Sequence, residues 1–256
     1  MARSGDKSSA SRQPRPTQGR TSAFATTNWS VVLEAGKGDL PRSAAAMEKL
    51  CRRYWYPIYA FVRRRGHDRQ AAEDLTQAFF AHLLDQETLK KVDSSKGKFR
   101  TFLLASLTNF LANEWDKRQS WKRGGRHQTI SLDEAGAEEL YRHEPVEPAT
   151  PEKLFDRRWA LTLVAEVIAR LQEEYTAQKK APLFAQLEPA LTGELAPGWH
   201  AESAALLGMS EGAVRVALHR LRRRFGQLLR QEIAQTVTGP AEVDEEIRQL
   251  FSALSA

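Results

Sequence analysis

The sequence predicts an all-α protein made of two small helical domains joined by an acidic flexible linker, the second containing a helix-turn-helix. Leu, Ala, Arg, Glu and Gln dominate both halves, and runs of β-branched residues are scarce, which favours helices over strands. A length of 256 residues suits two small domains. A stretch rich in acidic residues and proline separates the two helical parts.

Apolar periodicity in the front half predicts helices over 29–35, 42–65, 68–84 and 99–117. Gly66 follows the second of these, where glycine commonly ends a helix. Pro57 lies inside the same helix and predicts a kink or break near Tyr56, because proline removes a backbone donor.

The third predicted helix has two distinct faces. Its core face collects Ala71, Ala72, Leu75, Ala78, Phe79 and Leu83. Its outward face collects Glu73, Asp74, Gln77, Phe80 and Leu84. An outward surface with apolar residues beside acids suggests docking to a protein. Single exposed apolar residues are also common on protein surfaces, so this pattern alone leaves both interpretations open.

The fourth predicted helix divides in the same way, with an apolar stripe of Leu103, Leu104, Leu107, Phe110, Leu111 and Trp115. The opposite side carries Phe102, Asn109 and Asn113, which offer a stacking surface and amide groups for base edges. A basic run follows and is typical of nucleic-acid backbone contacts, with Lys117, Arg118, Lys122 and Arg123. Simple solvation of the amides and charges is the alternative.

The strongest motif lies in the back half, at HAESAALLGMSEGAVRVALHRLRRRF. A short helix over 201–207 meets Gly208, and Ser210 can cap a second helix that begins at Glu211, which is a helix-turn-helix pattern. One arc of the second helix is apolar and the opposite arc is basic, which favours DNA contact over a merely solvated helix. The residues expected nearest to DNA are Ser210, Gly212, Arg215, Val216, His219, Arg222 and Arg223.

Charge distribution and composition exclude several classes of protein. Lys and Arg number 38 against 32 Asp and Glu, for a net charge of +6. The basic excess includes the first twenty residues, whereas 130–156 is strongly acidic. The single cysteine, Cys51, cannot form an internal disulfide, and no apolar run is long enough to span a membrane, so we expect a cytoplasmic protein. No zinc-protease motif or glycine-rich phosphate loop occurs, so we expect no catalysis, metal or cofactor.

Three segments in order carry a family resemblance: YWYPIYAFVRRRGHDRQAAEDLTQAFFAHLL, KGKFRTFLLASLTNFLANEWDKRQSWKRGG and ESAALLGMSEGAVRVALHRLRRRF. Together they resemble the sigma-70 family of bacterial RNA polymerase sigma factors, particularly the extracytoplasmic-function (ECF) type. Phe102 stands where many relatives have Trp, and it keeps a stacking surface. The stretch 173–199 is longer than usual for the family and lacks its Leu-Pro…Arg signature.

The resemblance implies a role for each face. The outward face of helix 68–84 would bind the clamp helices of the core RNA polymerase largest subunit. The segment 85–98, with Phe102, Asn109 and Asn113, would open and hold the minus-ten promoter element, with Lys117 and Arg118 near phosphates. The helix-turn-helix would contact the minus-thirty-five element. Promoter DNA and core polymerase are the expected partners, an anti-sigma factor is a further one, and no membrane is expected.

The expected domains follow from these segments. They are a disordered basic tail (1–27), a sigma region 2-like domain (28–127), an acidic Pro-rich linker (128–154), a sigma region 4-like domain (155–235) and an acidic C-terminal helix or tail (236–256). A stand-alone helix-turn-helix regulator that binds duplex operators without polymerase is the alternative function. It explains the back half but leaves the outward Phe80 and Leu84 unexplained.

Overall fold

The computed structural model describes residues 40–84, 98–120, 134–143, 150–193, 195–237 and 239–255. In these ranges every regular element is an α-helix, so the prediction of an all-α protein is confirmed. The helices are α2 (Leu40–Arg64), α3 (Arg69–Leu84), α5 (Phe99–Ser120), α6 (Glu134–Arg142), α7 (Pro151–Ala177), α8 (Ala181–Leu187), α9 (Pro189–Thr192), α10 (Trp199–Leu207), α11 (Glu211–Ala234) and α12 (Ala241–Ser255).

The helices predicted over 42–65, 68–84 and 99–117 correspond to α2, α3 and α5, whereas the one predicted over 29–35 lies outside the described residues. Of the kink or break predicted near Tyr56, the break does not occur, because α2 continues through Pro57. Tyr54, Ile58 and Phe61 around the proline are fully buried, and this packing compensates for the missing backbone hydrogen bond.

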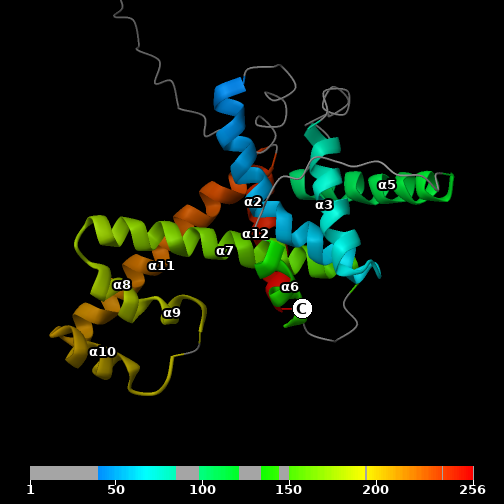
Figure 1. Ribbon diagram of the computed structural model, residues 1–256. Helices are drawn as coiled ribbons and strands as arrows, with labels where there is room; N and C mark the ends of the chain where they lie inside the picture. Colours follow the sequence, from blue (N-terminus) through cyan, green and yellow to red (C-terminus); the bar gives the residue numbers. More distant parts are fainter. Residues whose placement is uncertain are drawn as a thin grey trace, which may run out of the picture.

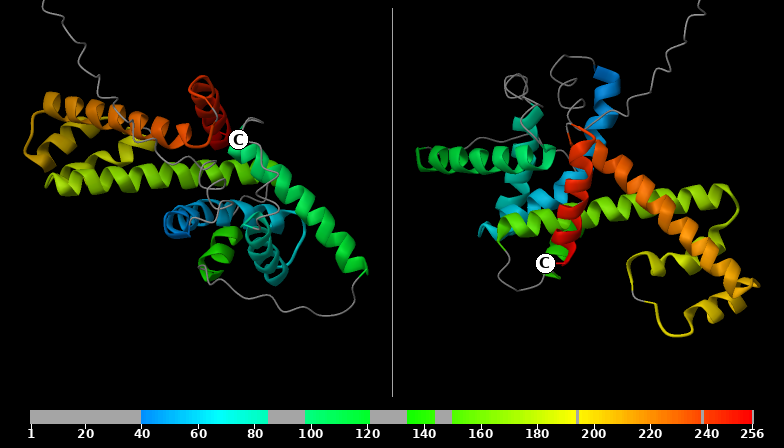
Figure 2. Two further views of the ribbon diagram at one scale, coloured as in Figure 1. Left: turned by 90° about the horizontal axis from the view of Figure 1, so that it is seen from above. Right: turned by 180° about the vertical axis from the view of Figure 1, so that it is seen from behind.

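Helix α7 lies at the centre of the described fold, as Figure 1 shows. It packs most extensively against α2, and α11 and α12 also lie against it (Figures 1 and 2). Its 27 residues extend over about 40 Å, enough for neighbours along its whole length. Buried residues recur along one stripe from Leu154 to Leu171, which explains how one helix serves both halves of the chain.

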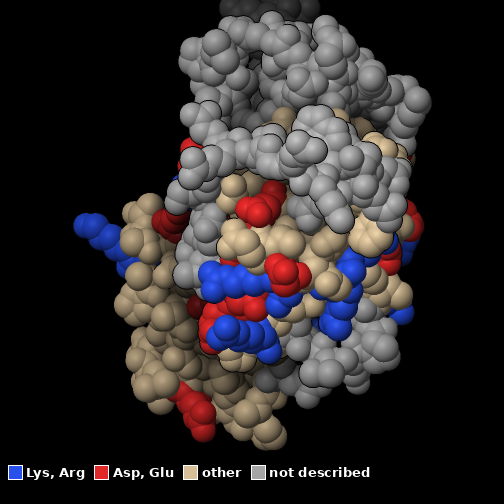
Figure 3. Space-filling model, turned by 45° about the vertical axis from the view of Figure 1, so that its right-hand side comes forward, with Lys and Arg blue, Asp and Glu red and all other residues tan. Residues whose placement is uncertain are grey.

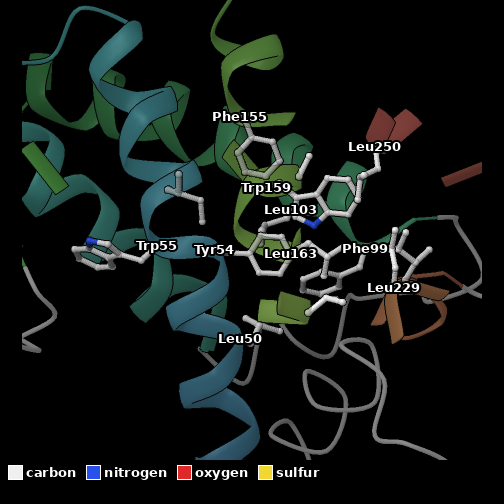
Figure 4. Packing of buried hydrophobic residues seen from close by; sticks show 14 of the residues in the cluster. Leu50, Tyr54, Trp55, Phe99, Leu103, Phe155, Trp159, Leu163, Leu229 and Leu250 are labelled. Carbon is white, nitrogen blue, oxygen red and sulfur yellow. The ribbon is translucent and has the colours of Figure 1, made fainter. Parts of the chain in front are cut away.

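A continuous core joins the front and back halves. Figure 4 shows Tyr54 of α2, Phe99 of α5 and Trp159 of α7 turned toward one another, with Trp55 on another side of α2. The rings of Tyr54 and Phe99 meet edge to face at 5.5 Å. We predicted two domains on either side of a flexible linker, and the described helices instead share this core. The domain boundaries themselves stay a prediction.

Buried ion pairs reinforce the junction of α2, α7 and α11. The guanidinium of Arg53 is 1% exposed and donates to the carboxylates of Glu166 on α7 and Glu232 on α11. Burial opposes its charge, but these two carboxylates outweigh that effect and raise the pKa of Arg53 above its ordinary value. Arg170 also reaches Glu232, at 3.4 Å. The buried charges are thus compensated by their partners.

Part of the expected linker is helical and packed. Helix α6 contacts α2, where the Tyr59 hydroxyl and Arg63 donate to Glu138. Burial raises the pKa of the Glu138 carboxyl, but these hydrogen bonds outweigh it and the pKa is lowered. Helix α7 then begins at Thr150, whose hydroxyl accepts a hydrogen bond from the Lys153 amide at 3.3 Å. The acidic linker predicted over 128–154 therefore contains α6 and the start of α7.

The C-terminal segment, predicted as an acidic helix or tail, forms helix α12. Helix α12 packs against α7 and α11, and Leu250 is fully buried. Glu246 is also fully buried and pairs with Lys98 at 2.9 Å and Arg100 at 3.0 Å, at the start of α5. The Phe99 amide donates to the Thr236 carbonyl at 2.9 Å, so the C-terminal region fixes where α5 begins.

Candidate nucleic-acid interface

A tight turn orients α10 against α11. Gly208 ends α10 with φ of 62°, a left-handed conformation that glycine adopts without strain. The Ser210 hydroxyl then accepts a hydrogen bond from the Ala213 amide at 3.2 Å and begins α11, as predicted. The two helices therefore meet across three residues, 208–210.

Helices α8 and α9 support this turn from the stretch 173–199. Phe184 and Leu187 of α8 are buried, and the Gln186 amide donates to the Ser203 hydroxyl of α10 at 2.9 Å. In the same way, the Arg222 guanidinium of α11 donates to the Ala190 carbonyl of α9 at 2.9 Å. This long segment thus forms a base under α10 and α11.

The first half of α11 presents an exposed face opposite its buried one. Val214, Leu218 and Leu221 are buried as predicted. The side chain of Val216 lies on the opposite side and is 50% exposed. All the predicted contact residues are exposed, namely Ser210, Gly212, Arg215, Val216, His219, Arg222 and Arg223. The exposed face of α11 is therefore basic, with the small residues Gly212 and Val216 at its centre, and this shape suits a helix that enters a DNA groove.

The basic side chains of this face differ in their partners. Arg215 pairs loosely with Glu211 at 3.4 Å, and both are exposed. His219, Arg220 and Arg223 form no hydrogen bond or ion pair with any residue that the structure describes. Arg220 is exposed and was missed by our sequence reasoning, although it lies only about 80° from Gly212 around the helix. Placing every Arg and Lys of α11 by its angle around the helix would have identified Arg220 as part of this face.

The second candidate surface lies on α5, which projects from the other described helices in Figures 1 and 2. Asn109 and Asn113 are exposed and one helical turn apart, as predicted. Phe102 is half-buried beside Phe99, with ring centres 6.0 Å apart. Side chains are not described for the next predicted residues, and the last two lie outside the described residues altogether: Lys117, Arg118, Lys122 and Arg123.

One residue of the predicted apolar stripe on α5 does not face the core. Leu103, Leu107 and Phe110 are buried, but the Trp115 side chain is 63% exposed. It does not belong to the core that the described residues form. The prediction of a core position for Trp115 is wrong.

The predicted outward face of α3 is partly buried. Phe80 is 3% exposed and stacks on Trp55 of α2, with ring centres 5.8 Å apart. Glu73 is 5% exposed and pairs with Arg69 at 2.7 Å. The buried arc of α3 is therefore wider than a single stripe, and the predicted outward positions of Glu73 and Phe80 are wrong.

The other residues of that face have mixed positions. Asp74 is exposed, Gln77 is half-buried, and nothing is described for the side chain of Leu84. Figure 3 shows basic and acidic side chains directly beside one another on the face it draws. The surface drawn in Figure 3 therefore carries charges of both signs, whereas the first half of α11 has an excess of basic groups.

Other kinds of site were also sought. Within the described ranges, no group of three or more His, Cys, Asp and Glu could hold a metal ion. Among the same residues, no helix is long and apolar enough to cross a membrane. Burial raises the pKa of the Cys51 thiol to about 11, so this side chain is a protonated packing residue at neutral pH.

Comparison with known families bears on the second candidate surface. Residues 50–121 match the family model described as Sigma-70 region 2. The match supports a sigma-70 family sigma factor. It covers most of α2 and all of α3 and α5, which carry the second candidate surface. No curated protein and no solved structure matches the chain.

The sigma-70 region 2 match has coarse functional implications. The region 2 segment indicates a role in RNA polymerase binding and promoter melting, and the family implies core RNA polymerase and promoter DNA as partners. The chain is thus connected with transcription initiation. Helices α7 to α12 lie outside the matched residues, so the function of the α10–α11 surface rests on its geometry.

Proposed function

We propose that this chain is an ECF-type sigma factor, a non-catalytic cytoplasmic subunit that binds core RNA polymerase and directs promoter recognition, DNA melting and transcription initiation. One observation carries the proposal: the chain combines a sigma-70 region 2 segment with a separate, exposed basic helix face outside that segment. A factor that binds a promoter at two elements needs two such surfaces. An anti-sigma factor is a partner that this function allows.

The α10–α11 unit is the proposed helix-turn-helix that reads the minus-thirty-five element. Its support is the exposed basic face of α11, together with the tight turn at Gly208 and the cap at Ser210. Arginine can bind guanine edges with two hydrogen bonds, and an exposed valine can contact a thymine methyl group. Arg215 and Val216 are therefore the proposed base contacts, with Arg223 and His219 beside them.

The face of α5 is the proposed contact to the minus-ten element. Asn109 and Asn113 supply exposed amides, and the half-buried Phe102 supplies a ring edge near the same side. Single-stranded bases bind by stacking on aromatic rings and by hydrogen bonds to their edges. The basic residues Lys117, Arg118, Lys122 and Arg123 are proposed phosphate contacts.

Helix α3 is the proposed contact to the clamp helices of the polymerase. The exposed Asp74 and the half-buried Gln77 support this role directly, and Leu84 completes the proposed set. Glu73 and Phe80 contribute through packing, because both are buried within the free protein.

Transcription by cognate core polymerase over a genomic promoter pool, with and without the protein, tests the proposal. Stimulation from a subset of promoters that share two spaced elements is expected. The double variant Asp74→Ala and Gln77→Ala should weaken association with core polymerase while far-ultraviolet circular dichroism stays unchanged. Phe80→Ala is the matched control: it should lower stability through the lost stacking on Trp55.

A stand-alone helix-turn-helix regulator is the competing function. Burial of Phe80 removes one objection to it, since that ring needs no outside partner. The sigma-70 region 2 match favours the polymerase subunit nonetheless. Site-specific duplex binding by the free protein, without association with core polymerase, would overturn our proposal and support the regulator.

A further inference from the structure

The exposed face of α11 has an arginine on each flank, and the two differ in their hydrogen-bonding partners within the described residues. Arg222 lies on the flank beside α9, and Arg220 lies on the flank beside α7. Both are basic and exposed, and each lies about 80° from Gly212 around the helix, so helix geometry alone gives both access to DNA. Their partners within the protein distinguish them.

Arg222 already has a structural partner. Its guanidinium donates to the carbonyl of Ala190, at 2.9 Å, and Ala190 is 1% exposed. This carbonyl belongs to α9, a single short turn of helix. A short helix has few hydrogen bonds of its own, so a charged donor from α11 is well suited to hold it in position.

Arg220 lacks such a partner. It donates no hydrogen bond and forms no ion pair among the residues that the structure describes. Burial raises the pKa of the Tyr175 hydroxyl on α7, and the nearby positive charge of Arg220 opposes this rise. One turn further along the same flank, Arg224 binds Glu174 of α7 at 2.8 and 2.6 Å. Arg224 is thus used within the protein, whereas Arg220 is available.

We propose that Arg220 contacts a backbone phosphate of bound DNA, and that Arg222 is a positioning residue that acts through the Ala190 carbonyl of α9. This inference rests on the proposed function of α11 as the DNA-contacting helix. A phosphate contact on the flank fixes how the helix lies in the groove without reading sequence. The central side chains, such as Val216 and Arg223, then face the base edges or the opposite strand.

The salt dependence of DNA binding tests both assignments. Each phosphate contact adds about 0.9 to the slope of log affinity against log salt. The full-length protein is titrated onto a labelled mixed-sequence duplex of about 30 base pairs, at salt from about 50 mM to about 200 mM. Arg220→Ala should flatten the slope by about 0.9, so that the salt effect over this range falls about threefold.

Two variants complete the design. Arg222→Ala should keep the wild-type slope and should speed amide hydrogen exchange in 189–193, because α9 loses its anchor. Arg52→Ala removes an exposed arginine that pairs with Glu48 on α2, and it controls for the change in net charge. It should change neither the slope nor the exchange of α9.

The outcomes separate this inference from the proposed function. Wild-type protein without salt-dependent DNA binding would contradict the proposed function of α11. Wild-type binding with an unchanged slope in Arg220→Ala would overturn the phosphate assignment alone. A flattened slope in Arg222→Ala, with α9 exchange unchanged, would show that Arg222 contacts phosphate and would overturn its positioning role.

Discussion

The two halves of α11 use charge in different ways. In the first half, up to Arg223, the helix exposes basic groups such as His219 and Arg223 that have no hydrogen-bonding partner within the described chain. In the second half, the carboxylate of Glu232 is buried and pairs with Arg53 and Arg170. The same helix therefore offers unpaired charge to a ligand at one end and matched charge to the core at the other.

This contrast separates binding residues from structural ones more clearly than residue type does. Arginine occurs in both halves, but a buried guanidinium needs nearby carboxylates to offset its desolvation. An exposed, unpaired guanidinium costs little in water and can meet a phosphate or a base. Pairing within the protein, rather than basic character, is the observation that indicates function on this helix.

Removal of a ring from the shared core should have the largest effect. Trp159 is fully buried, and Arg100 lies 4.8 Å from its ring. Trp159→Ala should lower the free energy of unfolding by about 3–5 kcal/mol, through lost burial and a residual cavity. Chemical denaturation followed by circular dichroism measures this. Trp115→Ala, at an exposed site on α5, should change stability by no more than about 0.5 kcal/mol; equal losses would contradict the described core.

Loss of a buried carboxylate at the junction should come next. Glu232→Ala leaves Arg53 with Glu166 alone. We expect a loss of about 2–3 kcal/mol in the free energy of unfolding, because a charged hydrogen bond disappears from a buried site. Asp244→Ala breaks the exposed pair with Arg230 and should cost less than about 1 kcal/mol. If Glu232→Ala lowered the free energy of unfolding no more than Asp244→Ala does, the Arg53–Glu232 pair would behave as a solvent-exposed pair, and its described burial would be contradicted.

The exposed half of α11 should respond in binding rather than in stability. Arg215→Ala should weaken binding to a cognate upstream element by about 1–3 kcal/mol and relax specificity at one position, if its guanidinium meets a base edge. Its loose pair with Glu211 predicts little change in the free energy of unfolding. Fluorescence anisotropy with matched and single-substituted duplexes measures both effects. Equal weakening on every sequence would assign Arg215 to phosphate.

Local patterns predicted the helices well. Three helices of the front half and the cap at Ser210 agree with the sequence, because periodicity and capping act within a few residues. Packing between distant segments could not be predicted in this way. Arg53 and Glu166 are 113 positions apart, and neither local sequence indicates that they pair. For this reason the sequence did not predict the core that the described front and back helices share.

The candidate site shows the same limit. Most of the exposed face of α11 was predicted, although Arg220 was missed, because one side of that helix faces solvent and a single stripe describes it. Helix α3 is covered over a wider arc, so both Phe79 and Phe80 are buried although they are adjacent in sequence. Which side of an amphipathic helix is outward depends on its neighbours, and α2 with its Trp55 decides it here.

The smallest expected effect concerns pH at the boundary between the two halves of α11. The hydrogen bonds from Arg224 lower the pKa of the Glu174 carboxyl below its ordinary value of 4.5. A carboxyl with a lowered pKa in the folded state stabilises the fold above its unfolded-state pKa, and this stabilisation is lost as pH falls through the folded value. Glu174→Gln should therefore be less stable than wild type at pH near 7, and the difference should shrink below about pH 4.5. Unfolding midpoints across this range measure it; Glu245→Gln, in a more exposed pair with Arg248, is the comparison. A Glu174→Gln deficit that stays constant with pH would show that Arg224 is not held by this carboxylate, and Arg224 would then join the unpaired cations of the first half of α11.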